Sequence, residues 1–273
     1  HADIAALFAL MLSGRRSCTK LFWGIRCSDM DPNRYRYLRG VCSWLSGLPD
    51  GIIANSHSGL EFHIDNLGYR PKQATVIHNC IDMERYHFNE RVRHRIRGEL
   101  GLHKNTFVVA AVARVDVMKD YPTFISALSG MRGVTAIAVG KGTEVLPKIP
   151  NLMRLGERHD ISDLLSASDV LVSASAFGEG FSNVLAEAMA CQRAVISTNV
   201  GDAARLIGGA GLIIPPSSPD LLNEAIKKLR NVGEMRKRMG EIGRKRIATV
   251  CQLKMITAAF DHFYEFGENT LNI

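Results

Sequence analysis

The sequence predicts an α/β protein built on parallel β-sheets and divided into two sections. Short apolar segments alternate with helical segments along most of the chain, which is the pattern of a parallel sheet covered by helices on both faces. Glycine-containing turns follow several of the expected strands. At 273 residues and 46% hydrophobic content, the chain is long enough for one large or two ordinary domains with substantial cores.

The first section has three expected strands separated by helices. We expect strands at 20–25, 50–55 and 75–77, and helices at 2–12, 33–44 and 57–67. This is only half of a doubly wound domain. Because the chain opens on His1 rather than Met, we expect it to be a fragment.

The second section has a complete series of strands and helices, entered through a basic helix at 90–100. The expected strands are 107–113, 134–139, 152–155, 169–173, 194–197 and 211–214, and the helices between them are 121–130, 161–167, 181–191, 202–207 and 218–230. Such a series makes a doubly wound sheet, which binds its ligands at the carboxyl ends of the strands. Two further helices, at 233–248 and 252–266, finish the chain.

The chain carries a formal net charge of +7, and two basic stretches, 91–97 and 235–246, look like exposed helix faces. This charge suits an anionic substrate or a lipid surface, or it forms a solvated basic face. Six cysteines without a C-x-x-C pair indicate neither a zinc site nor a redox motif and favour a reducing cytoplasm. The apolar run from Ile4 to Leu12 is too short to span a bilayer, so we expect a buried helix rather than a signal peptide.

A glycine-flanked loop and a helix follow the strand expected at 169–173. Glu179 lies in this loop between Gly178 and Gly180, and the helix is expected to start near Phe181. The amides of its first turn and the positive end of its dipole make an anion site. Glu187 stands on the inward face of the second turn. Two carboxylates around an anion site suit a ligand with both phosphate and hydroxyl groups, as in a nucleotide-sugar; the alternative is a buried helix start.

Two cations follow the first strand of the second section. Arg114 and Lys119 stand at the end of that strand, where a planar guanidinium and a compact ammonium are able to converge on one diphosphate. Such a pair would neutralise the leaving group as it takes up charge. The alternative interpretation is two solvated surface cations.

Two short glycine loops follow the next strands, and both also fit plain turns between a strand and a helix. Gly140 belongs to a G-K-G turn, and Gly156 precedes Glu157 and Arg158. Neither loop is G-x-G-x-x-G, so the dinucleotide fingerprint of dehydrogenases is absent. The sequence Asp29-Met30-Asp31 superficially resembles a D-x-D metal motif, but Asp31 fits an N-cap better.

Three motifs together resemble the group 1 glycosyltransferases, also called glycosyltransferase family 4. They are E-x7-E within EGFSNVLAEAMAC, R-x4-K at Arg114 and Lys119, and VIHNCIDMERY, which is similar to the family's stretch between domains. The resemblance implies a retaining enzyme of the GT-B fold, with two Rossmann-like doubly wound domains. We expect an incomplete N-terminal domain at 1–84, a donor-binding domain at 85–251, and a final helix within 252–273 that packs back on the first domain.

The resemblance also implies roles for individual residues. Glu179 would contact the donor sugar hydroxyls and Glu187 the ribose hydroxyls, while Arg114 and Lys119 hold the diphosphate. His1 falls where the family has a histidine close to the reacting sugar. The remaining expected contacts to the nucleotide and its phosphates are Gly140, Gly156, Glu157, Arg158, Gly180, Phe181, Ser182 and Asn183. The family needs neither metal nor cofactor.

The sequence departs from the family pattern at three positions. His78 replaces a proline, Cys80 replaces a glycine, and Asp120 stands where glycine is frequent. The change at Cys80 matters most, because we expect the glycine to supply a backbone φ that costs energy for cysteine.

We therefore expect retaining transfer of a hexose from a nucleotide-diphosphate sugar to a glycan or lipid-linked acceptor, in polysaccharide or cell-envelope biosynthesis. The reaction would take place in the cytoplasm, at the inner face of the membrane, with peripheral contact to the membrane surface and no nucleic acid partner. One rival is a catalytically impaired fragment that only binds nucleotide-sugar. A second, a nicotinamide-dependent oxidoreductase, is disfavoured by the missing glycine fingerprint.

Overall fold

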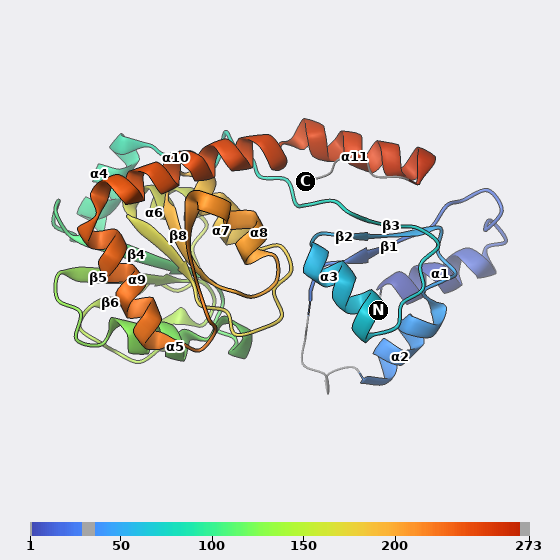
Figure 1. Ribbon diagram of the computed structural model, residues 1–273, viewed down its shortest axis with the longest axis horizontal. Coiled ribbons are helices and arrows are strands. Elements are labelled where there is room, and N and C mark those ends of the chain that lie inside the picture. The colour runs from blue at the N-terminus through green and yellow to red at the C-terminus, as the bar shows by residue number, and fades with distance from the viewer. Residues whose placement is uncertain (1, 29–35, 268–273) are drawn as a thin grey trace. The chain divides into compact units, whose positions relative to one another are not determined.

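The computed structural model describes residues 2–28 and 36–267, and the chain forms two compact units. Unit 1 takes in the chain up to Cys80, the short segment Gly178–Phe181, and the residues from Leu253 onward. Unit 2 consists of Ile81–Phe177 and Ser182–Gln252. Each unit is described by itself, with the elements labelled as in Figure 1.

Unit 1 is built on a three-stranded parallel sheet in the order β1-β2-β3. Its strands are β1 (Phe22–Ile25), β2 (Gly51–Ala54) and β3 (Ala74–Val76). Its helices are α1 (Ala2–Leu12), α2 (Arg36–Leu45), α3 (His57–Glu61), the π-helix η1 (Phe62–Asn66) and α11 (Leu253–Phe266). The single helix expected at 57–67 is thus α-helical only to Glu61 and then widens into a π-helical turn, closed by a hydrogen bond from Leu67 N to Phe62 O of 3.2 Å.

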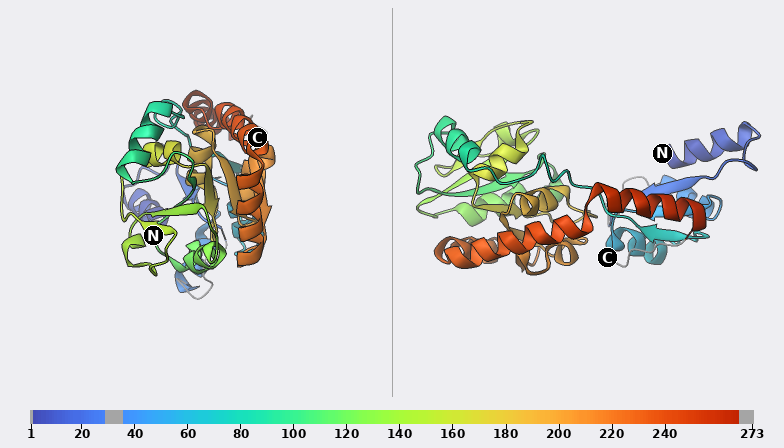
Figure 2. Two further views of the ribbon diagram at one scale, coloured as in Figure 1. Left: turned by 90° about the vertical axis from the view of Figure 1, so that its left-hand side faces the viewer. Right: turned by 90° about the horizontal axis from the view of Figure 1, so that it is seen from above.

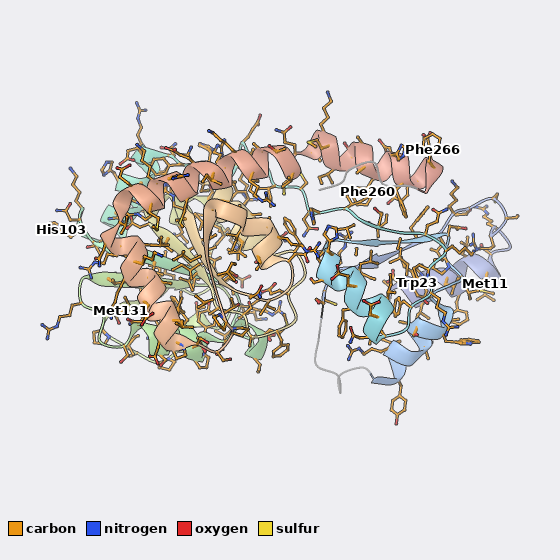
Figure 3. All side chains as sticks on the ribbon, in the orientation of Figure 1. Met11, Trp23, His103, Met131, Phe260 and Phe266 are labelled. Atoms are coloured by element: carbon orange, nitrogen blue, oxygen red, sulfur yellow. The ribbon has the colours of Figure 1, made fainter. Side chains whose placement is uncertain are left out.

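The sheet of unit 1 is covered on both faces because successive residues of its central strand point in opposite directions. Ile52 packs with Leu7, Trp23 and Leu45 beneath α1 and α2. Ile53, on the other face, packs with Ile256, Ala259 and Phe263 of α11. Figures 1 and 3 show α11 on one side of the sheet, and α1, α2 and Trp23 on the other.

Unit 2 contains a six-stranded parallel sheet in the order β6-β5-β4-β7-β8-β9, which confirms the predicted doubly wound arrangement. The strands are β4 (Phe107–Val112), β5 (Val134–Val139), β6 (Leu152–Arg154), β7 (Val170–Ser173), β8 (Ala194–Thr198) and β9 (Gly211–Ile214). The α-helices are α4 (Glu90–Glu99), α5 (Tyr121–Leu128), α6 (Ile161–Ala167), α7 (Asn183–Ala190), α8 (Ala203–Ile207), α9 (Pro219–Asn231) and α10 (Gly233–Val250). Three short 3-10 turns complete it: η2 (Val117–Lys119), η3 (Thr143–Val145) and η4 (Gly208–Ala210).

Helices cover both faces of the six-stranded sheet (Figure 2). On one face, Phe124 of α5 and Ile226 of α9 pack against Val109 of β4. Helices α4, α6 and α7 cover the other face, with Leu164 and Leu185 fully buried. The sheet grows outward in both directions from β4 and β7, so its topological switch point lies between these two strands.

The two basic stretches are not simply exposed helix faces, which corrects that expectation. Arg97 of α4 is 4% exposed, and it pairs with Asp169 at 2.9 Å. Arg93 pairs with the other oxygen of the same carboxylate at 2.7 Å. In α10, Arg244 donates to the carbonyl of Ala190 at 2.6 Å. The periodicity of the sequence underestimated the burial of these arginines. Their partners lie far away along the chain, and a paired and hydrogen-bonded charge is able to be buried.

The expected strain at Cys80 is also absent. Among the described residues, the non-glycine residues with positive φ are Asp120, Gln192 and Ser217, and Cys80 is not one of them. The loop therefore accepts cysteine without a left-handed backbone. In residues 2–28 and 36–267, no helix combines the length and apolar character needed to cross a membrane.

Candidate ligand-binding site

A small crevice of ≈ 20 Å³ lies in unit 2 where β4 and β7 end. It is lined by residues at the ends of both strands, by Lys119 and Tyr121 that follow β4, and by Val184 of α7. The carboxyl ends of the two strands that flank a switch point are where open α/β sheets bind ligands. The fold thus places this crevice where the sequence predicted a site.

Arg114 and Lys119 come to the crevice on the segment after β4. Lys119 lines it directly from the end of the turn η2, which Asp116 caps by accepting from Met118 N at 3.0 Å. The Arg114 side chain is 61% exposed, and its Nε lies 3.3 Å from Asp116 Oδ2. An exposed pair of this kind contributes only about 0–1 kcal/mol, so little opposes a change of partner from carboxylate to phosphate.

Asp120 explains why the family favours glycine at this position. Its φ of 45° and ψ of 51° lie in the left-handed region, where glycine is unstrained and aspartate is one of the tolerated residues. Asp120 also caps α5 by accepting from the amide of Thr123 at 3.1 Å and its hydroxyl at 2.7 Å. Aspartate therefore adopts the glycine backbone and supplies a cap that glycine lacks.

The loops after β4, β5 and β6 are hydrogen-bonded to one another. Val115 N donates to Lys141 O at 2.8 Å, and Gly140 N donates to Gly156 O at 2.7 Å. Gly140 has a φ of 132°, and a Cβ there would collide with the carbonyl of Ala113. Gly140 is thus required for the close approach of two loops, whether or not it also touches a ligand.

The side chain of Arg158 is already engaged. Its guanidinium donates to both carboxylate oxygens of Asp160, at 2.8 and 2.6 Å, and this pairing lowers the pKa of Asp160. Glu157 beside it is exposed. If this segment contacts a base, its main chain is better placed to do so than the Arg158 side chain.

Helix α7 begins two residues later than the sequence indicated. Ser182 occupies the N-cap position and Asn183 is the first helical residue, but the Ser182 side chain makes no capping hydrogen bond. The amides of Val184 and Leu185 therefore receive no cap from it. A helix start beside the crevice presents its first-turn amides and the positive end of the helix dipole, which suit an anion.

The segment Gly178–Phe181 belongs to unit 1. The Phe181 ring lies 5.2 Å from the ring of His78. A Cβ on Gly180 would lie 2.8 Å from Ser56 Oγ and 3.0 Å from Asn55 Oδ1, so this glycine also permits a close approach. Glu179 is in the same segment, and His1 lies outside the described residues.

Glu187 stands half-buried on the second turn of α7, and it has a partner that the sequence did not reveal. The Tyr86 hydroxyl hydrogen-bonds to the Glu187 carboxylate. Burial raises the pKa of Glu187, whereas the Tyr86 hydrogen bond and the charge of Arg85 lower it. Burial and the facing carboxylate raise the pKa of Tyr86 to about 12. The available signal was Tyr86 itself, a hydroxyl at the end of VIHNCIDMERY where the family pattern has phenylalanine.

The segment that carries Tyr86 is fixed to the end of α7 by side chains from two other helices. Arg244 donates to the carbonyls of Tyr86 at 3.1 Å and Ala190 at 2.6 Å. Ser162 of α6 donates to the Arg85 carbonyl at 2.6 Å. The Tyr86 hydroxyl is therefore held in place against Glu187.

A metal centre finds no support in the part of the chain that the structure describes. Within it, no group of three or more histidine, cysteine, aspartate and glutamate side chains is placed to hold a metal ion. Asp29 and Asp31, the residues of the D-x-D sequence, lie outside the described residues.

Comparison with known proteins identifies sequence relatives of this chain. Residues 106–231 match the family model described as glycosyl transferases group 1. The 4-alpha-N-acetylgalactosaminyltransferase of Campylobacter jejuni that acts on N-acetylgalactosamine-N,N'-diacetylbacillosaminyl-diphospho-undecaprenol is 27% identical over 201 residues, or 69% of this chain and 53% of that protein. The putative teichuronic acid biosynthesis glycosyltransferase TuaC of Bacillus subtilis is 31% identical over 167 residues, 57% of this chain and 41% of that protein. The matches thus span about half the length of these relatives.

Solved structures show the same fold at low identity. HepE of Anabaena, solved with UDP and glucose, superposes with a TM-score of 0.88 at 22% identity, covering 97% of this chain and 75% of that one. A glycosyltransferase of Rickettsia africae has a TM-score of 0.80 at 18% identity, covering 95% and 74%. At these identities the likeness establishes the fold alone.

Proposed function

The chain belongs to the group 1 glycosyltransferases through residues 106–231, and from this premise we propose that it transfers a hexose from a nucleotide-diphosphate sugar with retention of configuration. The acceptor is a glycan or a lipid-linked sugar in polysaccharide or cell-envelope biosynthesis. The names of the relatives from C. jejuni and B. subtilis, which refer to an undecaprenol-linked sugar and to teichuronic acid biosynthesis, support this class of acceptor.

One observation carries the proposal: a crevice at the switch point of a doubly wound sheet, with Lys119 in its wall and Arg114 on the same loop. These cations hold the diphosphate and stabilise the charge that the leaving nucleotide takes up. The start of α7 adds amide donors for phosphate oxygens. In this proposal the positive charge of the protein does what a bound cation does in other transferases.

The two carboxylates of E-x7-E have different tasks in this proposal. Glu187 accepts hydrogen bonds from the ribose hydroxyls, for which its second oxygen and the positioning bond from Tyr86 are suited. Glu179 accepts hydrogen bonds from hydroxyls of the donor sugar. Retention requires the bond from the anomeric carbon to the diphosphate to break and the acceptor oxygen to bond on the same face of the sugar.

We place the reaction in the cytoplasm at the inner surface of a membrane. The support is the lipid-linked, undecaprenol-containing substrate in the name of the C. jejuni relative. A peripheral contact would let the enzyme reach a lipid-linked acceptor without a membrane span.

The experiment is a titration with UDP-, GDP- and ADP-sugars that follows thermal stabilisation, in buffer with and without a chelator. A ligand that binds only the folded state at 100 times its Kd stabilises by about 2.7 kcal/mol. We expect one nucleotide class to raise Tm, equally with and without chelator. No shift with any nucleotide-sugar would contradict the proposal.

A second candidate function is binding of nucleotide-sugar without transfer, because the matches span only about half the length of the curated relatives. Positioning of the acceptor beside the reacting carbon contributes about 7–11 kcal/mol to such reactions, and donor binding alone does not require it. Turnover separates the two: sugar transfer supports the enzyme, and donor binding without transfer or hydrolysis supports the binding protein.

A further inference from the structure

Helix α2 of unit 1 has apolar residues on two opposite faces. Its inner face contributes Leu45, 5% exposed, to the core with Trp23 and Ile52. Its outer face and the turn after it carry Tyr37, Val41, Trp44 and Leu48, spaced four, three and four residues apart. Within the helix this spacing puts Tyr37, Val41 and Trp44 on one face, and Leu48 follows in the turn; we call these four side chains the α2 stripe.

The α2 stripe is far more exposed than a core position. Tyr37 is 85% exposed and Trp44 84%, while Val41 and Leu48 are each 44% exposed. The outer face of a helix on a soluble domain ordinarily carries polar and charged residues. Two almost fully exposed aromatic rings one above the other on such a face indicate a binding surface.

A basic groove of ≈ 730 Å³ lies beside the stripe, and Trp44 lines both. Its lining residues include Arg39 and Arg70 and no carboxylate. The Arg39 guanidinium lies 5.7 Å from the centre of the Phe62 ring. The backbone of Arg70 is fixed by its amide, which donates to Ser46 Oγ at 2.8 Å. The groove thus presents two positive charges on an ordered wall.

The combination fits a bilayer surface with anionic headgroups. Tyrosine and tryptophan rings partition to the level of the headgroups, with the apolar body inside and the polar tip in water. Arginines beside them meet lipid phosphates. A second copy of the chain fits less well, because a two-fold contact through this face would bring two sets of Arg39 and Arg70 together.

We propose that the α2 stripe and the groove with Arg39 and Arg70 dock the protein on an anionic membrane surface. The inference identifies the surface that makes the membrane contact of the proposed function. It rests on the proposed function only for the biological role of docking. Docking is measured without any nucleotide, so the two proposals fail separately.

The test is co-sedimentation of the full 273-residue chain with phosphatidylcholine vesicles, with and without phosphatidylglycerol. The chain has two tryptophans, of which Trp23 is 3% exposed and buried in the core, so a change in emission on docking reports on Trp44. We expect binding to the anionic vesicles with a blue shift of the emission, weaker binding in high salt, and little binding to neutral vesicles.

Matched variants distinguish vesicle binding through this surface from nonspecific binding of the protein. Trp44→Ser should weaken vesicle binding by about tenfold, whereas Val145→Ser, which changes a 78% exposed apolar side chain of unit 2, should leave it unchanged. Arg70→Gln should weaken it by about fivefold, as expected for one arginine at an anionic surface, whereas the exposed Lys104→Gln should not. Trp44→Phe should retain most of the binding.

Three results would overturn the proposal. The first is no binding to anionic vesicles by a folded protein. The second is binding that Trp44→Ser and Arg70→Gln leave intact. The third is a dimer in light scattering that Trp44→Ser dissociates, because the stripe would then be an interface between copies. Nucleotide binding is measured on the wild type and on the same variants and should be equal in all of them; its absence from the wild type would count against the proposed function and leave the docking result standing.

Discussion

The two edges of the six-stranded sheet use the same charged residue types in opposite ways. At the amino ends of β4 and β7, Arg97 and Asp169 are buried, Arg93 is half-buried, and both arginines pair with Asp169. At the carboxyl ends, Arg114 is 61% exposed and paired only weakly, and Lys119 lines a small crevice. Burial and pairing, more than residue type, thus decide the role of a charged side chain. A buried and paired charge stabilises the fold, whereas an exposed and weakly paired one is able to bind a ligand.

The amino edge is saturated with hydrogen bonds. Asp169 accepts from Arg93, from Arg97 and from the amide of Val108 at 2.8 Å. Arg93 also donates to the carbonyls of residues 166, 167 and 168. Nearby, Arg193 lies 4.3 Å from the centre of the Phe88 ring, and burial lowers its pKa to about 10. The Asp169 carboxylate and its two arginine partners therefore have most of their hydrogen-bonding capacity used within the protein.

The largest expected effect is at the amino edge. Asp169→Asn should lower the free energy of unfolding by about 3–5 kcal/mol, because it leaves the buried Arg97 and the half-buried Arg93 without their counter-charge. Urea denaturation measures the loss. The control is Asp163→Asn, which breaks a pair with the exposed Arg95 and should change stability little. Equal losses for the two variants would remove the contrast between the edges.

At the carboxyl edge we expect a mutation to change ligand affinity strongly and stability little. Arg114→Ala should weaken binding of nucleoside diphosphate at least about tenfold, since a charge-assisted hydrogen bond to phosphate contributes about 1.5–3 kcal/mol. The same variant should leave the urea midpoint nearly unchanged, because its pair with Asp116 is exposed. Isothermal titration checks the affinity, with Arg132→Ala, an exposed arginine elsewhere in unit 2, as the control. Unchanged affinity with an intact fold would exclude Arg114 from the site.

The two carboxylates sharpen the comparison further. Glu187→Gln keeps the shape but weakens the acceptor for ribose hydroxyls, so it should reduce affinity for every nucleotide form by about tenfold. Glu179→Gln should spare free nucleoside diphosphate and weaken only the sugar-loaded donor. Titration of each variant with both ligands measures the difference. Equal losses for both ligands in both variants would contradict this division of roles.

The smallest expected effect concerns Tyr86. Tyr86→Phe removes the hydrogen bond that lowers the pKa of Glu187, so this pKa, already raised by burial, should rise further. A raised pKa means that folding favours the protonated form: stability falls as pH rises through the folded pKa, and ribose binding to the carboxylate falls as pH drops below it. Nucleotide affinity should decrease about two- to tenfold, more at acidic pH. An affinity profile over pH that matches the wild type would leave Tyr86 a structural role only.

Much of the fold could be predicted from the sequence because its strands are local apolar runs ended by polar or glycine-containing turns. The bounds predicted for α1, β5, α6 and β9 are confirmed to the residue. The doubly wound order of unit 2 followed from the repeated alternation of strand and helix. The same alternation predicted that Arg114, Lys119 and Glu187 follow strands at one edge, since the carboxyl ends of parallel strands share an edge.

The sequence by itself therefore determined the elements, their order and the edge that carries the candidate site. Only the tertiary structure decided which charges are available there. Arg97 is buried because it pairs with Asp169, 72 residues further along the chain. Glu187 is positioned by Tyr86, which precedes the strands of the six-stranded sheet in the sequence. The physical reason is that periodicity depends on neighbours within a few residues, whereas the protonation and pairing of a buried group depend on partners that meet only when the chain folds.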